Sequence, residues 1–116
     1  MKTNELSGVV LDLAVAKCEG VPLIAGCLFT KDPKDGTHYS PSTNWAQGGP
    51  IIEREKISLI WMQFSDEQYW LASIDVGTLE APKECEARGD APLIAAMRCY
   101  VLSKLGDEVQ IPEGIQ

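Results

Sequence analysis

Two apolar segments joined by a short polar link, residues 57–64 and 69–74, most constrain how this chain folds. In the first segment, apolar residues fall on both alternating faces, which is typical of a strand covered on both sides. We therefore expect residues 57–64 to form a central strand. Residues 65–68 are polar and predict a hairpin loop, so residues 69–74 are expected to return as the antiparallel partner.

The first expected helix occupies residues 4–19. These residues are apolar around most of a helical wheel, and Gly20 follows them as a typical C-terminal stop. Thr3 or Asn4 can cap this helix, and Gly8 can interrupt its first turn. One narrow polar stripe is predicted from three acidic residues that recur at a spacing of seven, namely Glu5, Asp12 and Glu19.

The second expected helix occupies residues 90–105. Asp90 is a natural N-cap, Pro92 fits the first turn, and Gly106 ends the helix. Small residues at a spacing of four allow another backbone to approach this helix closely. The stripe consists of Ala95, Cys99 and Ser103. Packing within the chain, against Ala14 and Cys18, is one use of this stripe, and a homodimer through the helices is the other.

The remaining segments are shorter. Residues 21–29 and 109–111 predict short strands, residues 31–37 a charged turn, and residues 76–89 a loop. The order of elements predicts an α+β fold in which two helices pack on one face of a short antiparallel sheet. A chain of this length is expected to form a small single domain over residues 1–116.

The charge of the chain restricts its partners. Of its 116 residues, 17 are acidic and 10 basic, which gives a net charge of -7. Direct binding of DNA or RNA needs clustered Lys and Arg and is not expected. No stretch approaches the ~20 apolar residues of a membrane helix, and the first residues do not resemble a signal peptide. We therefore expect a cytoplasmic protein that does not bind membranes.

The four cysteines do not form a metal or redox motif. They are Cys18, Cys27, Cys85 and Cys99, and no two have the C-x-x-C spacing. For a cytosolic protein, the expectation is reduced thiols that are mostly buried. No metal and no cofactor are expected.

The segment 40–55 is the best candidate for a functional site. It combines a tryptophan, amides, hydroxyls and charges in a stretch rich in Gly and Pro, and loops of that composition often hold function. Ser42 or Thr43 is expected to cap a single helical turn, which Gly48 and Gly49 end.

Trp45 in this segment has two interpretations. In the first it anchors a recognition loop, and the amides of Asn44 and Gln47 supply orienting hydrogen bonds. In the second it plugs the edge of the core, and the glycines and Pro50 form only a turn.

Nearby charged residues are expected to be structural. Glu53, Arg54 and Glu55 predict a solvated face, because acid–base catalysis needs a buried carboxyl with a raised pKa. His38 is expected to be a surface histidine in a loop. Arg98 is expected to fix the Trp45 loop through its carbonyls or Glu53, and the alternative is that it binds an anionic ligand.

Three blocks of the sequence, in order, resemble the NinX family of phage proteins. They are Glu5-Leu6-Ser7-Gly8 with residues 11–17, then residues 40–55, then residues 92–101 with 104–112. The resemblance implies a phage or prophage accessory protein that acts in the bacterial cytoplasm. It brings no established activity, cofactor or catalytic residue. It also implies that Asp often occupies the position of Asn44.

The expected function is that of a non-enzymatic module that binds a bacterial or phage protein. The residues expected to form its binding site are Ser42, Asn44, Trp45, Gln47, Gly48, Gly49, Glu53 and Arg98. The alternative is a nucleotide-like small-molecule binder or an enzyme, with the Trp45 loop as a pocket wall. A concave apolar pocket beside Trp45 would favour that alternative, and a flat or convex loop would favour protein binding. A weaker third hypothesis is an acidic mimic of nucleic acid.

Overall fold

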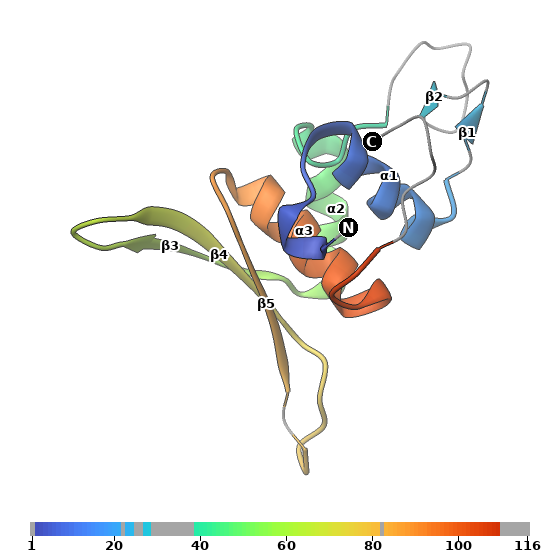
Figure 1. Cartoon of the computed structure of the whole chain (residues 1–116). Coiled ribbons are helices and arrows are strands. Elements are labelled where there is room, and N and C mark those ends of the chain that lie inside the picture. The colour runs from blue at the N-terminus through green and yellow to red at the C-terminus, as the bar shows by residue number, and fades with distance from the viewer. Residues whose placement is uncertain (1, 22, 25–26, 29–38, 82, 110–116) are drawn as a thin grey trace.

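The computed structural model describes residues 2–21, 23–24, 27–28, 39–81 and 83–109, and its α+β fold confirms the predicted class (Figure 1). In chain order the elements are the 3-10 turn η1 (Thr3–Glu5), α1 (Gly8–Glu19), β1 (Leu23–Ile24), β2 (Cys27–Leu28), α2 (Trp45–Glu55), β3 (Ser58–Gln63), β4 (Gln68–Asp75), β5 (Glu84–Gly89) and α3 (Pro92–Leu105). β1 and β2 pair antiparallel where one strand was predicted. The expected turn at residues 31–37, His38, and residues 110–111 of the last expected strand lie outside the described residues.

β3, β4 and β5 form an antiparallel sheet in that order. The predicted hairpin is present, with Trp61 opposite Trp70. The prediction that residues 57–64 form a central strand is wrong, because β3 is an edge of this sheet and β4 lies at its centre.

β5 lies in the stretch that was expected to be a loop. Its better-buried residues are small: Cys85, Ala87 and Gly89. Its exposed residues are charged: Glu84, Glu86 and Arg88. The strand therefore alternates correctly but lacks the β-branched and aromatic side chains by which strands are usually recognised.

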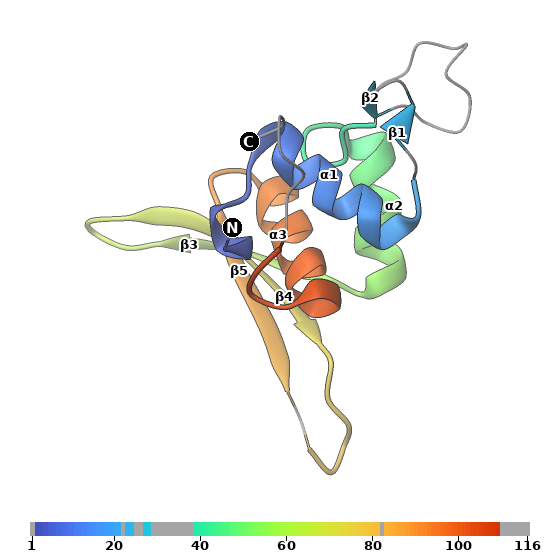
Figure 2. The same cartoon turned by 45° about the vertical axis from the view of Figure 1, so that its right-hand side comes forward.

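α3 lies between the sheet and the other helices (Figures 1 and 2). It packs on β4 and β5, whereas α1 and α2 pack mainly on α3. A Cβ added to Gly89 would lie 2.6 Å from the backbone nitrogen of Ala95, so β5 and α3 are in backbone contact there. Cys99 Sγ donates to the carbonyl of Cys85 at 3.1 Å. Two of the three small residues, Ala95 and Cys99, therefore approach β5 inside the chain, whereas the partners predicted for the stripe were Ala14 and Cys18 of α1.

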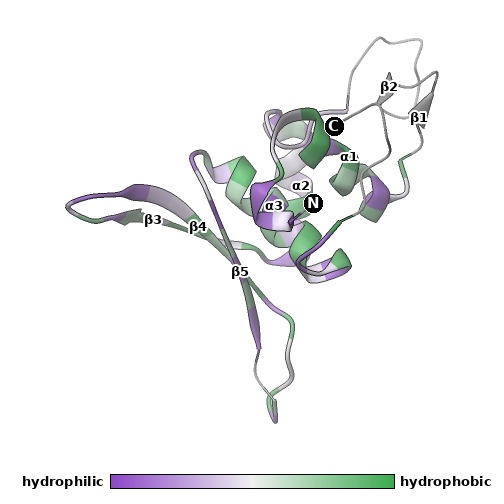
Figure 3. Cartoon of the chain, viewed as in Figure 1, coloured by the Kyte–Doolittle hydropathy of each residue, from purple (hydrophilic) through white to green (hydrophobic). Residues whose placement is uncertain are grey.

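The core is built on both sides of α3. Its fully buried large side chains include Leu6, Leu11, Val15, Met97 and Val101. Hydrophobic residues recur along α1 and α3 (Figure 3), as expected for helices that are covered on more than one side. Asp12 is buried within α1, so the predicted polar stripe is interrupted at its middle residue.

The helix ends follow the predicted signals in part. α1 begins at Gly8 (φ 56°), after the separate turn η1, and ends at Glu19. Gly20 caps it in the left-handed conformation (φ 74°). α3 ends before Gly106, as predicted. It begins at Pro92 with Ala91 as the N-cap residue, rather than with the predicted Asp90.

Candidate functional site

The segment that contains Trp45 is a helix rather than a loop with one helical turn. α2 begins at Trp45 and continues through Gly48, Gly49 and Pro50. The prediction that the two glycines end the helix is therefore wrong.

Tertiary packing explains why α2 continues through residues that favour a turn. Gly48 is buried, and a Cβ there would overlap the carbonyl oxygen of Pro41 and lie 2.7 Å from Cδ2 of Leu93. Ile51, one turn further on, is buried in the core. Burial of this face supplies the stability that Gly and Pro remove from the local helix propensity.

The N-terminus of α2 is held by polar side chains. Asn44 Oδ1 accepts a hydrogen bond from the N–H of Ala46 at 2.9 Å, so Asn44 is the N-cap in place of Ser42 or Thr43. An Asp at this position would cap the helix equally well. Gln47 Oε1 accepts a hydrogen bond from the N–H of Ser40 at 2.5 Å. The side-chain amides of Asn44 and Gln47 therefore accept hydrogen bonds from the backbone of their own segment and hold residues 40–46 in place.

Asp12 supports the same segment from α1. Its Oδ1 accepts a hydrogen bond from the N–H of Ser42 at 2.9 Å. Burial raises the pKa of Asp12, and the bond from Ser42 opposes that shift. Ser42 itself is only 2% exposed, and its Oγ has no hydrogen-bond partner in the described part of the chain. Ser42, a predicted binding residue, is therefore buried beneath the protein surface.

Trp45 is 55% exposed at the start of α2 and does not plug the core. Gly49 and Glu53 follow at spacings of four, which places all three residues on one face of the helix. A Cβ on Gly49 would lie 4.0 Å from Cε3 of the indole, and Glu53 is exposed. We call Trp45, Gly49 and Glu53 the Trp45 surface.

Arg54 and Glu55 join the C-terminal ends of three helices. Glu53 and Arg54 are exposed, as predicted for a solvated face, whereas the side chain of Glu55 is only partly exposed. Arg54 donates to both carboxylate oxygens of Glu19, at 3.0 and 2.7 Å, and to Glu55 at 2.8 Å. The hydroxyl of Tyr100 also donates to Glu19, and Lys104 Nζ lies 3.3 Å from Glu55. Hydrogen bonds from Arg54 lower the pKa of Glu19 and of Glu55. Both carboxylates are thereby stabilised in the ionised form, which is the opposite of what a general acid needs.

Arg98 is a structural tie, but the partners differ from those predicted. Its Nε donates to the carbonyl of Leu6 at 2.7 Å, and its Nη1 to the carbonyl of Arg88 at 2.8 Å. Arg98 therefore connects the segment before α1 with the end of β5. These bonds do not involve the Trp45 loop.

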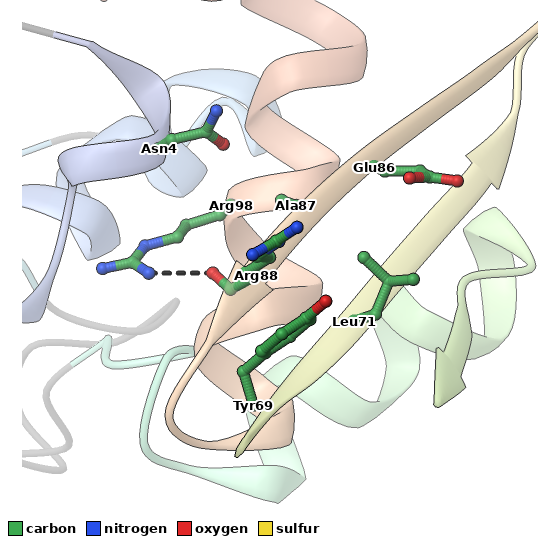
Figure 4. Close-up of a pocket in the computed structure, with 7 residues that line it drawn as sticks. All are labelled: Asn4, Tyr69, Leu71, Glu86, Ala87, Arg88 and Arg98. Atoms are coloured by element: carbon green, nitrogen blue, oxygen red, sulfur yellow. Dashed lines mark hydrogen bonds between the residues drawn. The ribbon is translucent and has the colours of Figure 1, made fainter. Parts of the chain in front are cut away.

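An open pocket of about 420 Å³ lies beside Arg98 on the sheet (Figure 4). Its lining residues are Asn4, Tyr69, Leu71, Glu86, Ala87, Arg88 and Arg98. The guanidinium of Arg88 lies over the ring of Tyr69, 4.2 Å from its centroid. Of the predicted site residues, Arg98 lines this pocket and the others do not, so the structure separates Arg98 from the Trp45 surface.

Neither Cys18 nor Cys99 is an activated nucleophile. Burial raises the pKa of Cys18 to about 11 and that of Cys99 to about 12, so both remain thiols at neutral pH. Within the described residues, no three His, Cys, Asp or Glu side chains gather as metal ligands. The same part of the chain contains no helix long and apolar enough to cross a membrane.

Several residues that support the site carry weak sequence signals. Asp12 is the only acidic residue among buried apolar neighbours in α1. An acidic residue in such a position is usually paired, and this was the one sequence signal for its burial. Glu19, Arg54 and Tyr100 are far apart in the sequence, so no local pattern connects them. Arg88 belongs to β5 and could not be placed before that strand was recognised.

A search of the curated proteins finds no match. A family model described as Bacteriophage P22, NinX matches residues 2–104. The match extends from η1 into the last turn of α3 and includes every residue of the predicted site. The chain therefore belongs to the bacteriophage P22 NinX family and is a phage-encoded protein.

Proposed function

We propose that this protein is a non-enzymatic interaction module of the bacterial cytoplasm, and that it binds a bacterial or phage protein through the Trp45 surface. The observation that carries the proposal is an exposed indole at the start of a helix whose N-terminus is held in place. Tryptophan is among the residues that contribute most to protein interfaces. A rigid support reduces the entropy lost on binding.

The internal bonds of the neighbouring residues support a preorganised anchor. Asn44 caps α2, Gln47 holds Ser40, and Gly48 packs tightly against Pro41 and Leu93. Little rearrangement of the backbone is then needed when a partner covers Trp45. The residues that act directly on the partner reduce to Trp45, Gly49 and Glu53.

Charge favours a partner with a basic surface. The chain has a net charge of -7, and Glu53 lies on the same face of α2 as Trp45. Complementary charge mainly increases the association rate and the discrimination between partners, while the buried aromatic supplies most of the affinity.

A small-molecule site beside Trp45 is less well supported. That alternative needs Asn44, Gln47, Glu53 and Arg98 to line one pocket. Asn44 and Gln47 hold backbone groups of their own segment, and Arg98 lines an open pocket on the sheet that excludes Trp45.

Affinity capture from bacterial lysate, with nuclease and read by mass spectrometry, tests the proposal. We expect a stoichiometric partner that survives nuclease and is lost with Trp45→Ala. Once the partner is purified, Trp45→Ala is expected to raise the dissociation constant at least about 30-fold, as for an interface hot spot. The variant should lose less than about 1 kcal/mol of unfolding free energy, because core aromatic truncations cost ~3–5 kcal/mol and Trp45 is exposed.

Leu79→Ala is the matched control. Leu79 is a fully exposed apolar residue in the link between β4 and β5, away from α2. Its removal should leave binding unchanged. A partner that binds Trp45→Ala as tightly as the wild-type protein would contradict the proposal, and so would unfolding of this variant.

A further inference from the structure

The β3–β4 hairpin exposes apolar side chains on both of its faces. Ile60 is 50% exposed and Trp61 is 45% exposed, and as adjacent strand residues they point to opposite faces. Phe64 is also exposed at the tip. The hairpin projects away from the helices (Figures 1 and 2). The sequence predicts a strand covered on both faces, and the rest of the described chain does not provide that cover.

The two edges of the sheet differ in charge. β5 carries Glu84, Glu86 and Arg88, and charged side chains discourage the addition of another strand. β3 has no charged residue from Ser58 to Gln63. Two copies paired along this edge would therefore have no like charges opposite one another, although the chain as a whole has a net charge of -7.

The hydrogen-bond register determines which backbone groups of β3 are available. The N–H of Phe64 donates to the carbonyl of Glu67 at 2.8 Å, at the end of the hairpin. Hydrogen-bonded and non-hydrogen-bonded pairs alternate along an antiparallel ladder. The backbone groups of Leu59, Trp61 and Gln63 therefore point away from β4. One antiparallel register pairs all three with the same three residues of a second copy, and it places Trp61 opposite Trp61.

We infer that two copies of this chain pair antiparallel through β3 and form a symmetric dimer with one continuous sheet. On one face, Ile60 lies opposite Met62 of the second copy. On the other face the two Trp61 side chains meet beside Trp70, whose ring centroid is already 5.4 Å from that of Trp61. Such a two-fold interface is self-complementary, as most dimer interfaces are.

Charges beyond the strand agree with this register. It brings Lys56, which follows α2, toward Asp66 of the second copy in the hairpin turn, and both residues are exposed. Opposite charges across antiparallel strands are favourable. The dimer therefore covers the apolar faces of the hairpin and pairs its flanking charges.

A pair of charged variants tests both the dimer and its register. Ile60→Lys with Met62→Lys places like charges opposite each other in the dimer, and so does Ile60→Glu with Met62→Glu. Analytical ultracentrifugation should show a wild-type dimer and a monomer for each variant alone, with the dissociation constant raised at least about 100-fold. An equimolar mixture of the two variants should form a heterodimer, because each introduced lysine then faces an introduced glutamate of the other chain.

Gln63→Pro tests the backbone pairing. It removes an N–H that points away from β4, and an edge strand accepts proline at such a position. We expect a folded monomer, whereas Gln63→Ala keeps the N–H and should remain a dimer; circular dichroism checks the fold of each variant.

Two results would overturn the inference. One is a wild-type protein that stays monomeric up to about 1 mM. The other is a dimer that survives both the Lys pair and Gln63→Pro, which would mean that another surface, such as the helices, joins the copies. The inference does not depend on Trp45, so monomeric variants that still bind the partner protein leave the proposed function intact.

Discussion

At the scale of single residues, neighbours in the sequence have unlike environments. Gly48 and Gly49 are adjacent, yet only Gly48 is buried against another part of the chain. The amides of Asn44 and Gln47 are engaged with backbone N–H groups, while Trp45 beside them is exposed. Residue type alone therefore did not distinguish the exposed Trp45 from the neighbouring residues that hold the segment in place.

Alanine at each glycine should distinguish these environments. Gly48→Ala brings a Cβ into Pro41 and Leu93, and we expect a net loss of about 1–2 kcal/mol in unfolding free energy, since overpacking exceeds the gain in helix propensity. Gly49→Ala has room beside the indole of Trp45 and should gain about 0.5–1 kcal/mol. Urea unfolding of both variants measures the two effects. Equal stabilisation by both changes would contradict the close packing at Gly48.

At the scale of elements, α2 shows packing that overrides local signals. Its Gly-Gly-Pro sequence predicts a turn, but the helix extends to Glu55 because Gly48 and Ile51 are buried. The ends of α1, α2 and α3 are then joined by Glu19, Arg54 and Tyr100. This junction fixes the helix that carries Trp45.

Glu19→Gln should weaken this junction in a pH-dependent way. The folded-state pKa of Glu19 lies below its ordinary value, chiefly because of Arg54. Its contribution is therefore present above the unfolded pKa of about 4.3 and is lost as pH falls through the folded pKa. We expect a loss of about 1–2 kcal/mol in unfolding free energy at pH 7.

Urea unfolding at several pH values measures this effect. The difference between Glu19→Gln and the wild-type protein should shrink toward zero near the acid end of the titration. Glu80→Gln, in the exposed link between β4 and β5, is the control and should cause little change at either pH. A difference that is independent of pH would mean that the ionised carboxylate of Glu19 is not what stabilises the junction.

At the scale of the whole molecule, the N-terminal segment is tied to distant parts of the chain. Thr3 donates to the carbonyls of Asp107 and Gly106, and Arg98 bonds to the carbonyl of Leu6. The second bond of Arg98, to Arg88, connects this segment to the sheet. These contacts hold η1 against α3 from both ends.

Arg98→Met tests this connection. It leaves the carbonyls of Leu6 and Arg88 without their charged donor, and we expect a loss of about 1.5–3 kcal/mol in unfolding free energy. Amide hydrogen exchange should accelerate most in η1 and the first turn of α1. Arg88→Met keeps the carbonyl of residue 88 and is the control. Unchanged exchange in η1 with Arg98→Met would contradict the connection.

The sequence alone determined the elements whose signals are local. Periodicity and end signals identified α1 and α3, and alternation identified the β3–β4 hairpin, because these patterns depend on residues a few positions apart. The family was recognised from the same kind of contiguous blocks. Trp45 was identified as a candidate anchor for a similar reason, since its neighbours are polar.

Only the tertiary structure decided the rest. β5 is a strand whose small residues pack against α3, and its sequence pattern alone did not predict it. The full length of α2 depends on the burial of Gly48 and Ile51. The position of β3 at an edge, and the separation of Arg98 from Trp45, depend on which strands and helices become neighbours. Such contacts join residues far apart in the chain. Their free energy comes from burial and close packing, which no local sequence pattern records.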